Sequence, residues 1–202
     1  MKITLNFIEP LLGSLPGNKT TASDFIRDKM VKEMEKTGQD TTEFNKELET
    51  LPEALEKGTT VFHRDSFGKP FVYNYQIKGL LKEAAEKMNG LDGFKNLRSK
   101  MQSYVYVSPR RIPITFEGDI TIFERPLRGM TMQGPRISLA RSEMIPAGAK
   151  ISFEVKIIEP PSEKMRISKE LFLKIFEFGQ NLGFLQFRNS GIYGAFDYKV
   201  ED

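Results

Sequence analysis

Hydrophobic and polar residues alternate along several short stretches of this chain, which is the pattern of strands with one buried face. The first stretch covers residues 2–8, where Ile3, Leu5 and Phe7 share one face. Residues 59–75 predict two short strands around a turn at 66–69. Further stretches predict strands at 103–107, 112–117 and 120–124, a loop at 125–135, a hairpin of 136–141 with 150–159, and a final strand at 192–200.

Other stretches repeat their apolar residues at helical spacing. The first predicts an amphipathic helix over residues 76–88, with a buried side of Ile77, Leu80, Leu81, Ala84, Ala85 and Met88. A last helix begins at Ser168, and its inward residues are expected to be Leu171, Phe172, Ile175, Phe178 and Leu182. Gly79 costs the first helix about 1 kcal/mol relative to Ala, which suggests that backbone or a ligand packs closely against it.

The order of these elements indicates the fold class. Helices are separated by pairs of strands, which favours an α+β fold with an antiparallel sheet and helices packed on one side. A ferredoxin-like (RRM-like) split βαβ core is the first choice. We expect one domain over residues 1–202, in which the polar, acidic residues 18–58 form a helical and partly mobile insertion, with a helix from Ser23 to Lys36.

The composition excludes several classes of functional site. The chain has no Cys, which excludes disulfides, thiolate nucleophiles and Cys-based zinc sites, and it has one His. A protein-only metal site would have to be built mainly from carboxylates, which suits Mg²⁺ or Ca²⁺ better than zinc. The expectation is no metal and no cofactor. The N-terminus lacks the apolar region of a signal peptide, and no stretch has the length of a membrane span, so a soluble cytoplasmic protein without a membrane partner is expected.

Cationic residues concentrate between residues 94 and 141, which hold nine cations against three anions. Seven of the nine are arginines, and the guanidinium group suits bidentate contacts to phosphate. Tyr104 and Tyr106 are expected on one face of a strand, as planes for stacking unpaired bases. The alternative is that these cations pair with the acidic residues 22–58 or are solvated. The candidate RNA-binding cations here are Arg98, Arg110, Arg111, Arg125 and Arg128.

His63 is the leading candidate for catalytic chemistry. Glu117, Asp119 and Glu124 could also supply a metal site or an acid/base pair, although Glu117-Gly-Asp119 lies at an expected strand turn, where acids favour the turn geometry. His63 titrates near neutrality and is flanked by Arg64 and Asp65, so it could act in metal-free RNA cleavage, although a single His near a strand end is more often structural or exposed. No spacing matches an EF-hand, a Walker loop, a dinucleotide fingerprint or a nucleophile signature. An enzyme is therefore the minority interpretation.

The C-terminal stretch GQNLGFLQFRNSGIYGAFDY is rich in glycine. Glycines at a helix end and a strand start let backbone N–H groups approach an anion, and Arg188 and Tyr193 lie beside Gly191 and Gly194. A helix cap and a tight turn explain two of the four glycines without any ligand.

Three stretches, in the family's order, together resemble the RAMP superfamily of RNA-binding proteins in CRISPR effector and processing complexes. They are PFVYNYQIKGLLKEAA, in which a strand leads into a helix opening with Lys-Gly, SEMIPAGAKISFEVKI, with a Pro-Ala-Gly turn, and the C-terminal glycine-rich stretch. The resemblance implies an RRM-like ferredoxin fold, assembly into a larger ribonucleoprotein involved in antiviral defence, and RNA contact near Lys78, Arg188 and the turn from Gly191 to Gly194.

The leading hypothesis is therefore a non-catalytic RNA-binding subunit that binds single-stranded RNA and other protein subunits. Two alternatives stay open. One is a protein–protein module of a phage or mobile element that acts on a host defence complex. The other is a metal-independent endoribonuclease that uses His63.

Overall fold

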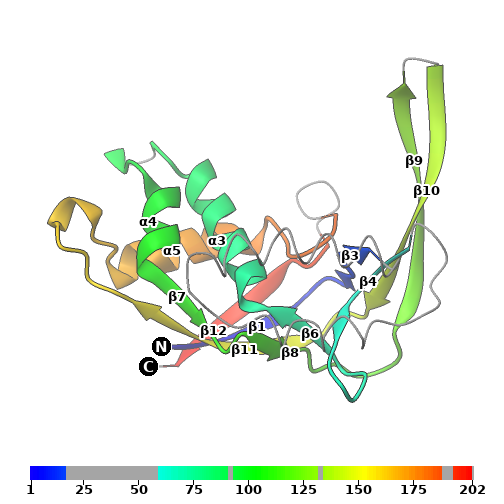
Figure 1. The fold of residues 1–202 in the computed structure, drawn as a ribbon, viewed down its shortest axis with the longest axis horizontal. Coiled ribbons are helices and arrows are strands. Elements are labelled where there is room, and N and C mark those ends of the chain that lie inside the picture. The colour runs from blue at the N-terminus through cyan, green and yellow to red at the C-terminus, as the bar shows by residue number, and fades with distance from the viewer. Residues whose placement is uncertain (17–58, 91–92, 132–133, 188–192, 202) are drawn as a thin grey trace. The chain divides into compact units, whose positions relative to one another are not determined.

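The structure is a computed structural model, and it describes residues 1–16, 59–90, 93–131, 134–187 and 193–201, with the backbone alone over 127–139. Figure 1 shows the course of these segments. The expected insertion at 18–58, including its helix from Ser23 to Lys36, lies outside the described residues.

The chain divides into two compact units. Unit 1 consists of Met1–Leu11, Val72–Gly118 and Pro146–Asp202, and unit 2 consists of Leu12–Phe71 and Asp119–Ile145. Each unit is thus assembled from segments that are distant in sequence. The single domain expected over residues 1–202 stays a prediction.

Unit 1 contains a four-stranded antiparallel sheet. Its strands, in spatial order, are β12 (Phe196–Glu201), β1 (Lys2–Phe7), β11 (Lys150–Ile157) and β7 (Val105–Ser108). The central pair β1 and β11 is aligned with Ile3 opposite Phe153 and Leu5 opposite Ile151. All four of these side chains are buried, whereas their sequence neighbours point to the other face, as period-two alternation requires.

Three helices of unit 1 cover the buried face of this sheet (Figure 1). They are α3 (Asn74–Lys87), α4 (Leu97–Tyr104) and α5 (Lys169–Gln180). Ser168 caps α5, because its hydroxyl oxygen accepts a hydrogen bond of 3.1 Å from the Leu171 N–H. A short 3₁₀ helix, η2 (Glu163–Met165), precedes α5, and the small strand β8 (Arg111–Pro113) follows β7. The predicted α+β fold with an antiparallel sheet and helices on one side is confirmed.

Unit 2 is built around a long antiparallel hairpin. Its strands are β9 (Thr121–Thr131) and β10 (Gly134–Ile145), and β10 also pairs in parallel with β4 (Thr59–Val61), which pairs with β3 (Leu15–Pro16). A second hairpin joins β5 (His63–Arg64) to β6 (Pro70–Tyr73), as expected from the turn at 66–69. The strands β6 and β2 (Leu11–Leu12) each cross the boundary between the units.

The predicted hairpin of 136–141 with 150–159 is wrong. The partner of β10 is β9, and β11 pairs with β1 and β7 instead. The predicted loop at 125–135 is also wrong at both ends, since β9 runs to Thr131 and β10 starts at Gly134. Pro126, Gly129, Gly134 and Pro135 disfavour a strand by propensity, and cross-strand pairing overrides that preference here.

Two expectations about helix packing are corrected. Phe178, an expected inward residue of α5, is 42% exposed, and Phe176 occupies the core instead. A Cβ atom added at Gly79 would meet no atom within 4 Å among the described residues. No described part of the chain therefore explains this glycine by close packing.

Candidate nucleic-acid interface

Lys78 of α3 and Tyr106 of β7 meet in unit 1, although the sequence separates them widely. The Lys78 Nζ atom lies 5.3 Å from the centre of the Tyr106 ring, within the range of a cation–π contact. The same ammonium group donates a hydrogen bond of 2.9 Å to the Gln102 carbonyl oxygen. Tyr106 stays 52% exposed. This pair thus presents a positive charge beside an accessible aromatic plane.

The position of Lys78 follows from the way α3 begins. The Tyr73 N–H donates a hydrogen bond of 2.8 Å to the Gln76 side-chain oxygen, which fixes the first turn. Ile77, Leu80 and Leu81 of the same helix are buried. Lys78 is half-buried, and its ammonium group reaches the sheet edge formed by β7.

The segment after β7 is tied to the same end of α3. The Asn74 side-chain N–H donates to the Val107 carbonyl oxygen at 3.0 Å, and the Asn74 backbone N–H donates to the Arg110 carbonyl oxygen at 2.9 Å. These bonds hold Arg110 beside the start of the helix that carries Lys78. Arg110 is half-buried and the adjacent Arg111 is exposed. We refer to Lys78, Tyr106, Arg110 and Arg111 as the α3–β7 cluster.

The chemistry of the α3–β7 cluster suits a single-stranded nucleic acid. Guanidinium and ammonium groups bind backbone phosphates, and an exposed phenol ring offers a face on which an unpaired base can stack. Four of the residues expected from the sequence to bind RNA thus belong to one unit and to neighbouring elements.

Arg98 and Tyr104 have other surroundings than expected. Both lie on α4, so the strand predicted at 103–107 is wrong over its first two residues and begins at Val105. Leu97 and Met101 are buried one helical turn apart, which favours the helix over the strand. The Arg98 guanidinium forms an exposed ion pair with Glu86. Tyr104 therefore does not share a strand face with Tyr106.

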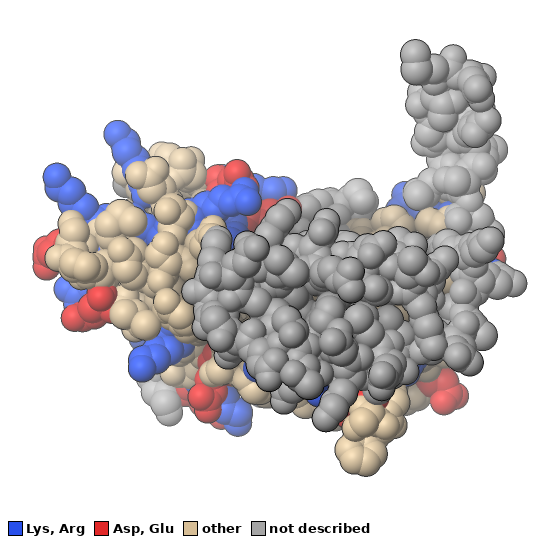
Figure 2. Space-filling model, viewed as in Figure 1, with Lys and Arg blue, Asp and Glu red and all other residues tan. Residues whose placement is uncertain are grey.

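The remaining arginines of the basic window belong to unit 2. Arg125 lies on β9 and is exposed, and Arg128 lies on the same strand, where only the backbone is described. The basic stretch of sequence is thus divided between the two units. On the face of unit 1 visible in Figure 2, Lys and Arg side chains are interspersed with Asp and Glu.

The C-terminal glycine turn is only partly described. Arg188 and Gly191 lie outside the described residues. Tyr193 is half-buried, and its carbonyl oxygen accepts a hydrogen bond of 3.3 Å from the Phe184 N–H. Gly194 has φ = +69°, and a Cβ atom there would come within 2.4 Å of the Phe184 carbonyl oxygen. Packing against the protein's own backbone is sufficient to explain Gly194.

His63 is buried in unit 2. Its ring stacks on Phe71 with 5.6 Å between the ring centres, and 5% of the residue is exposed. Burial lowers the pKa of His63 from 6.5 to about 4, because the charged imidazolium loses its hydration. The ring is therefore neutral at pH 7. This geometry gives a substrate little access to the imidazole.

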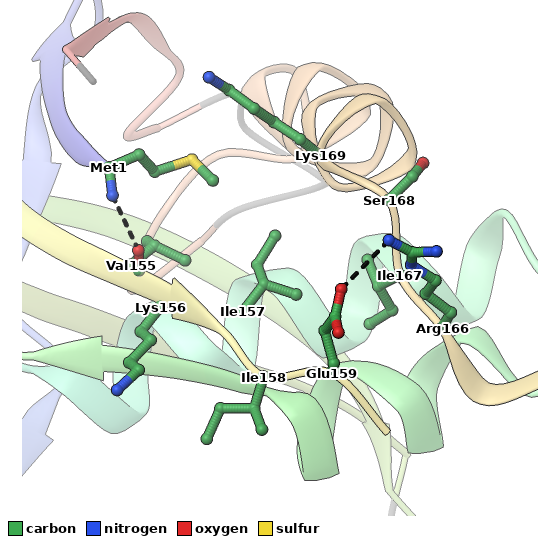
Figure 3. Close-up of a pocket in the computed structure, with 10 residues that line it drawn as sticks. All are labelled: Met1, Val155, Lys156, Ile157, Ile158, Glu159, Arg166, Ile167, Ser168 and Lys169. Atoms are coloured by element: carbon green, nitrogen blue, oxygen red, sulfur yellow. Dashed lines mark hydrogen bonds and ion pairs between the residues drawn. The ribbon is translucent and has the colours of Figure 1, made fainter. Parts of the chain in front are cut away.

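The described residues offer neither a metal site nor a membrane-spanning helix. No group of three or more His, Asp or Glu side chains among them could hold a metal ion. No helix in the described part of the chain is long and apolar enough to cross a membrane. An open hollow of about 620 Å³ in unit 1 lies beside Ser168 and includes the Arg166–Glu159 ion pair (Figure 3). None of the residues expected to bind RNA lines it.

One exposed aromatic residue was not recognised from the sequence. Phe67 lies in the turn between β5 and β6, and 85% of its surface is exposed. The signal was present, because an aromatic residue inside an Asp-Ser-Phe-Gly turn has no strand or helix face to bury it.

Comparison with known proteins gives matches among solved structures alone. No protein-family model matches the chain, and no curated protein matches it. Among solved structures, a chain of the cryo-EM structure of the Type III-B Cmr-beta bound to cognate target RNA is similar, with a TM-score of 0.48 and 11% sequence identity over 98% of this chain. The present chain spans 59% of the length of that chain. The case for a function therefore rests on the residues of this protein.

Proposed function

We propose that this protein binds single-stranded RNA as a non-catalytic, RAMP-type subunit of a ribonucleoprotein. The observation that carries the proposal is the contact between Lys78 and Tyr106, with Arg110 held at the same end of α3. In this proposal, Lys78, Arg110 and Arg111 bind phosphates, and one base stacks on Tyr106.

The topology of unit 1 supports the ferredoxin-like core that belongs to this proposal. Along the chain its main elements follow the order β1, α3, β7, β11, α5 and β12, which is a β-α-β-β-α-β sequence. In the sheet, β1 and β11 lie in the centre and β12 and β7 at the edges. Both crossover helices lie over the same face of the sheet (Figure 1).

The stretches that resemble the RAMP superfamily have matching local structure in part. Residues 70–85 do run from a strand, β6, into the helix that carries Lys78 and Gly79. The Pro-Ala-Gly turn at 146–148 does precede an alternating strand, β11. The strand before that turn is β10, which pairs with β9, so no hairpin forms across it. Much of the third stretch lies outside the described residues.

Fluorescence anisotropy with a fluorescein-labelled oligouridylate tests the proposal. The protein is expected to bind, and its affinity is expected to fall as salt is added, because phosphate contacts release counterions. Tyr106→Ala is expected to weaken binding by about tenfold, the size of one lost stacking contact. Lys78→Ala is expected to weaken RNA binding and to reduce the salt dependence of the affinity, because one phosphate contact is lost.

Two control variants match these changes. Phe178→Ala removes another exposed aromatic ring of unit 1, and Lys87→Ala removes another cation of α3. Both are expected to bind RNA like the unmodified protein. Absence of binding at low salt, or an affinity that does not respond to salt, would contradict the proposed function. Protein partners that remain bound after nuclease treatment, together with no RNA affinity, would favour the protein–protein module instead.

A further inference from the structure

Phe67 is held at the tip of a turn that hydrogen bonds fix on several sides. The Asp65 carboxylate accepts hydrogen bonds from the Phe67 N–H at 2.9 Å and from the Lys69 N–H at 2.8 Å. The Asp65 N–H donates to the Lys69 carbonyl oxygen, and the Asp65 carbonyl oxygen accepts from the Gly68 N–H, at 3.0 Å each. Gly68 adopts φ = +76°, which a residue with a side chain rarely adopts. The turn therefore presents its aromatic ring with little backbone freedom.

A partly buried ion pair between Arg64 and Glu143 stabilises this turn. The Arg64 guanidinium donates to the Gly68 carbonyl oxygen at 3.1 Å and to a Glu143 carboxylate oxygen at 2.6 Å. The other Glu143 oxygen accepts a hydrogen bond of 2.9 Å from the Phe62 N–H, and Glu143 is buried. Arg64 thus connects the tip of the β5–β6 hairpin to strand β10 through Glu143, whose carboxylate is also bonded to the Phe62 N–H.

The surroundings of Phe67 favour a nucleobase over a protein surface as its partner. Its neighbours Ser66, Gly68 and Lys69 are exposed and carry no apolar side chain. A protein interface buries its aromatic anchor within a larger apolar patch, and the described residues of this turn supply none. A base needs only a flat face, and its phosphate needs a nearby cation, which Lys69 provides.

We infer that Phe67 is a base-stacking residue of a second RNA contact, with Lys69 as its phosphate ligand. This inference rests on the proposed function, and it adds a contact in unit 2 to the α3–β7 cluster in unit 1. A rigid turn suits this role, because the ring loses little conformational freedom when a base stacks on it.

Three variants of Phe67 test the inference by RNA anisotropy with the labelled oligouridylate. Phe67→Ala and Phe67→Leu are both expected to weaken binding by about tenfold, since neither keeps an aromatic plane. Phe67→Trp is expected to keep the affinity. Ile122→Ala, which removes another exposed apolar side chain of unit 2, is the matched control and should bind normally.

Phe67→Trp gives an independent readout, because the protein contains no other Trp. Stacking on a base is expected to quench its emission when unlabelled oligouridylate is added. Unchanged affinity in Phe67→Ala, or emission that RNA does not quench, would overturn the inference while the proposed function stands. Emission that shifts to the blue with protein concentration and without RNA would also overturn it, by placing the ring against another protein surface. If the unmodified protein binds no RNA, the proposed function is contradicted, and the inference about Phe67 falls with it.

Discussion

At the scale of single residues, burial decides what His63 can do. The sequence predicted a candidate acid–base residue from its type, but the ring lies against Phe71 in the interior of unit 2. Burial lowers its pKa to about 4, so the imidazole is neutral in the folded protein at pH 7. The sequence shows that residue 63 is a His. It does not show which distant segments pack around the ring and remove its hydration.

The lowered pKa of His63 makes stability depend on pH in a defined direction. Between pH 6.5 and about 4 the unfolded chain binds a proton that the folded protein does not, so stability falls as the pH falls through this window. The loss from this residue is expected to reach about 3 kcal/mol near the folded pKa. Urea unfolding across this range measures it.

His63→Phe is the comparison, since it keeps an aromatic ring and removes the titrating group. The variant is expected to lose less stability than the unmodified protein over the same window, whatever its stability at neutral pH. Because His63 is the chain's one His, no other imidazole complicates the difference. Equal pH dependence in both proteins would show that His63 titrates normally.

At the scale of elements, the two glycines Gly79 and Gly194 behave in opposite ways. Gly79 lies inside α3 with open space around the position of a Cβ atom, among the described residues. Gly194 has a positive φ and its Cβ position meets the Phe184 backbone. The sequence predicted close packing by backbone or a ligand at Gly79 and the approach of an anion at the turn of Gly194, whereas at Gly194 the structure shows the protein's own Phe184 backbone.

This contrast predicts stability changes of opposite sign. Gly79→Ala is expected to stabilise the protein by about 1 kcal/mol, because Ala has the higher helix propensity. Gly194→Ala is expected to destabilise it by about 1–3 kcal/mol or more, from a strained backbone and a clash with Phe184. Thermal or urea unfolding of both variants measures the signs.

A lower stability for Gly79→Ala would mean that part of the chain outside the described residues packs on that side of α3. If stability rises as expected but RNA affinity falls, the open space beside Gly79 is occupied by the ligand. The second result would place the RNA backbone close to the helix start.

The strands illustrate where local pattern is sufficient and where it is not. Alternation located β1 and β11, whose buried faces are regular. It failed for β9 and β10, because Pro and Gly interrupt the pattern and only pairing between the two strands reveals them. It also failed at Tyr104, where helical burial of Leu97 and Met101 extends α4.

At the scale of the whole molecule, the local arrangement of cations is expected to affect RNA binding more than the net charge does. The net charge is only +3, yet Lys78 lies over the exposed Tyr106 ring and the Arg110 backbone is bonded to the start of the same helix. Each phosphate contact on a single strand contributes about 0.7 to the slope of log affinity against log salt. If the cations of the α3–β7 cluster bind phosphates, removing them is expected to change this slope measurably.

The combined variant Lys78→Ala, Arg110→Ala, Arg111→Ala is expected to flatten that slope by about 2. A control with the same charge change replaces Lys87, Lys164 and Lys174, which are exposed elsewhere in unit 1. The control should keep the slope of the unmodified protein. Equal slopes for the two variants would mean that the cations act only through net charge.

The sequence by itself determined the α+β class, the helices α3 and α5, and the strands with regular alternation, because these depend on periodicity and capping within short segments. It also identified Lys78, Tyr106, Arg110 and Arg111 one by one. Only the tertiary structure placed these four candidates on neighbouring elements of unit 1 and Arg125 in unit 2. It alone revealed the burial of His63, since burial depends on contacts between residues that are distant in the chain.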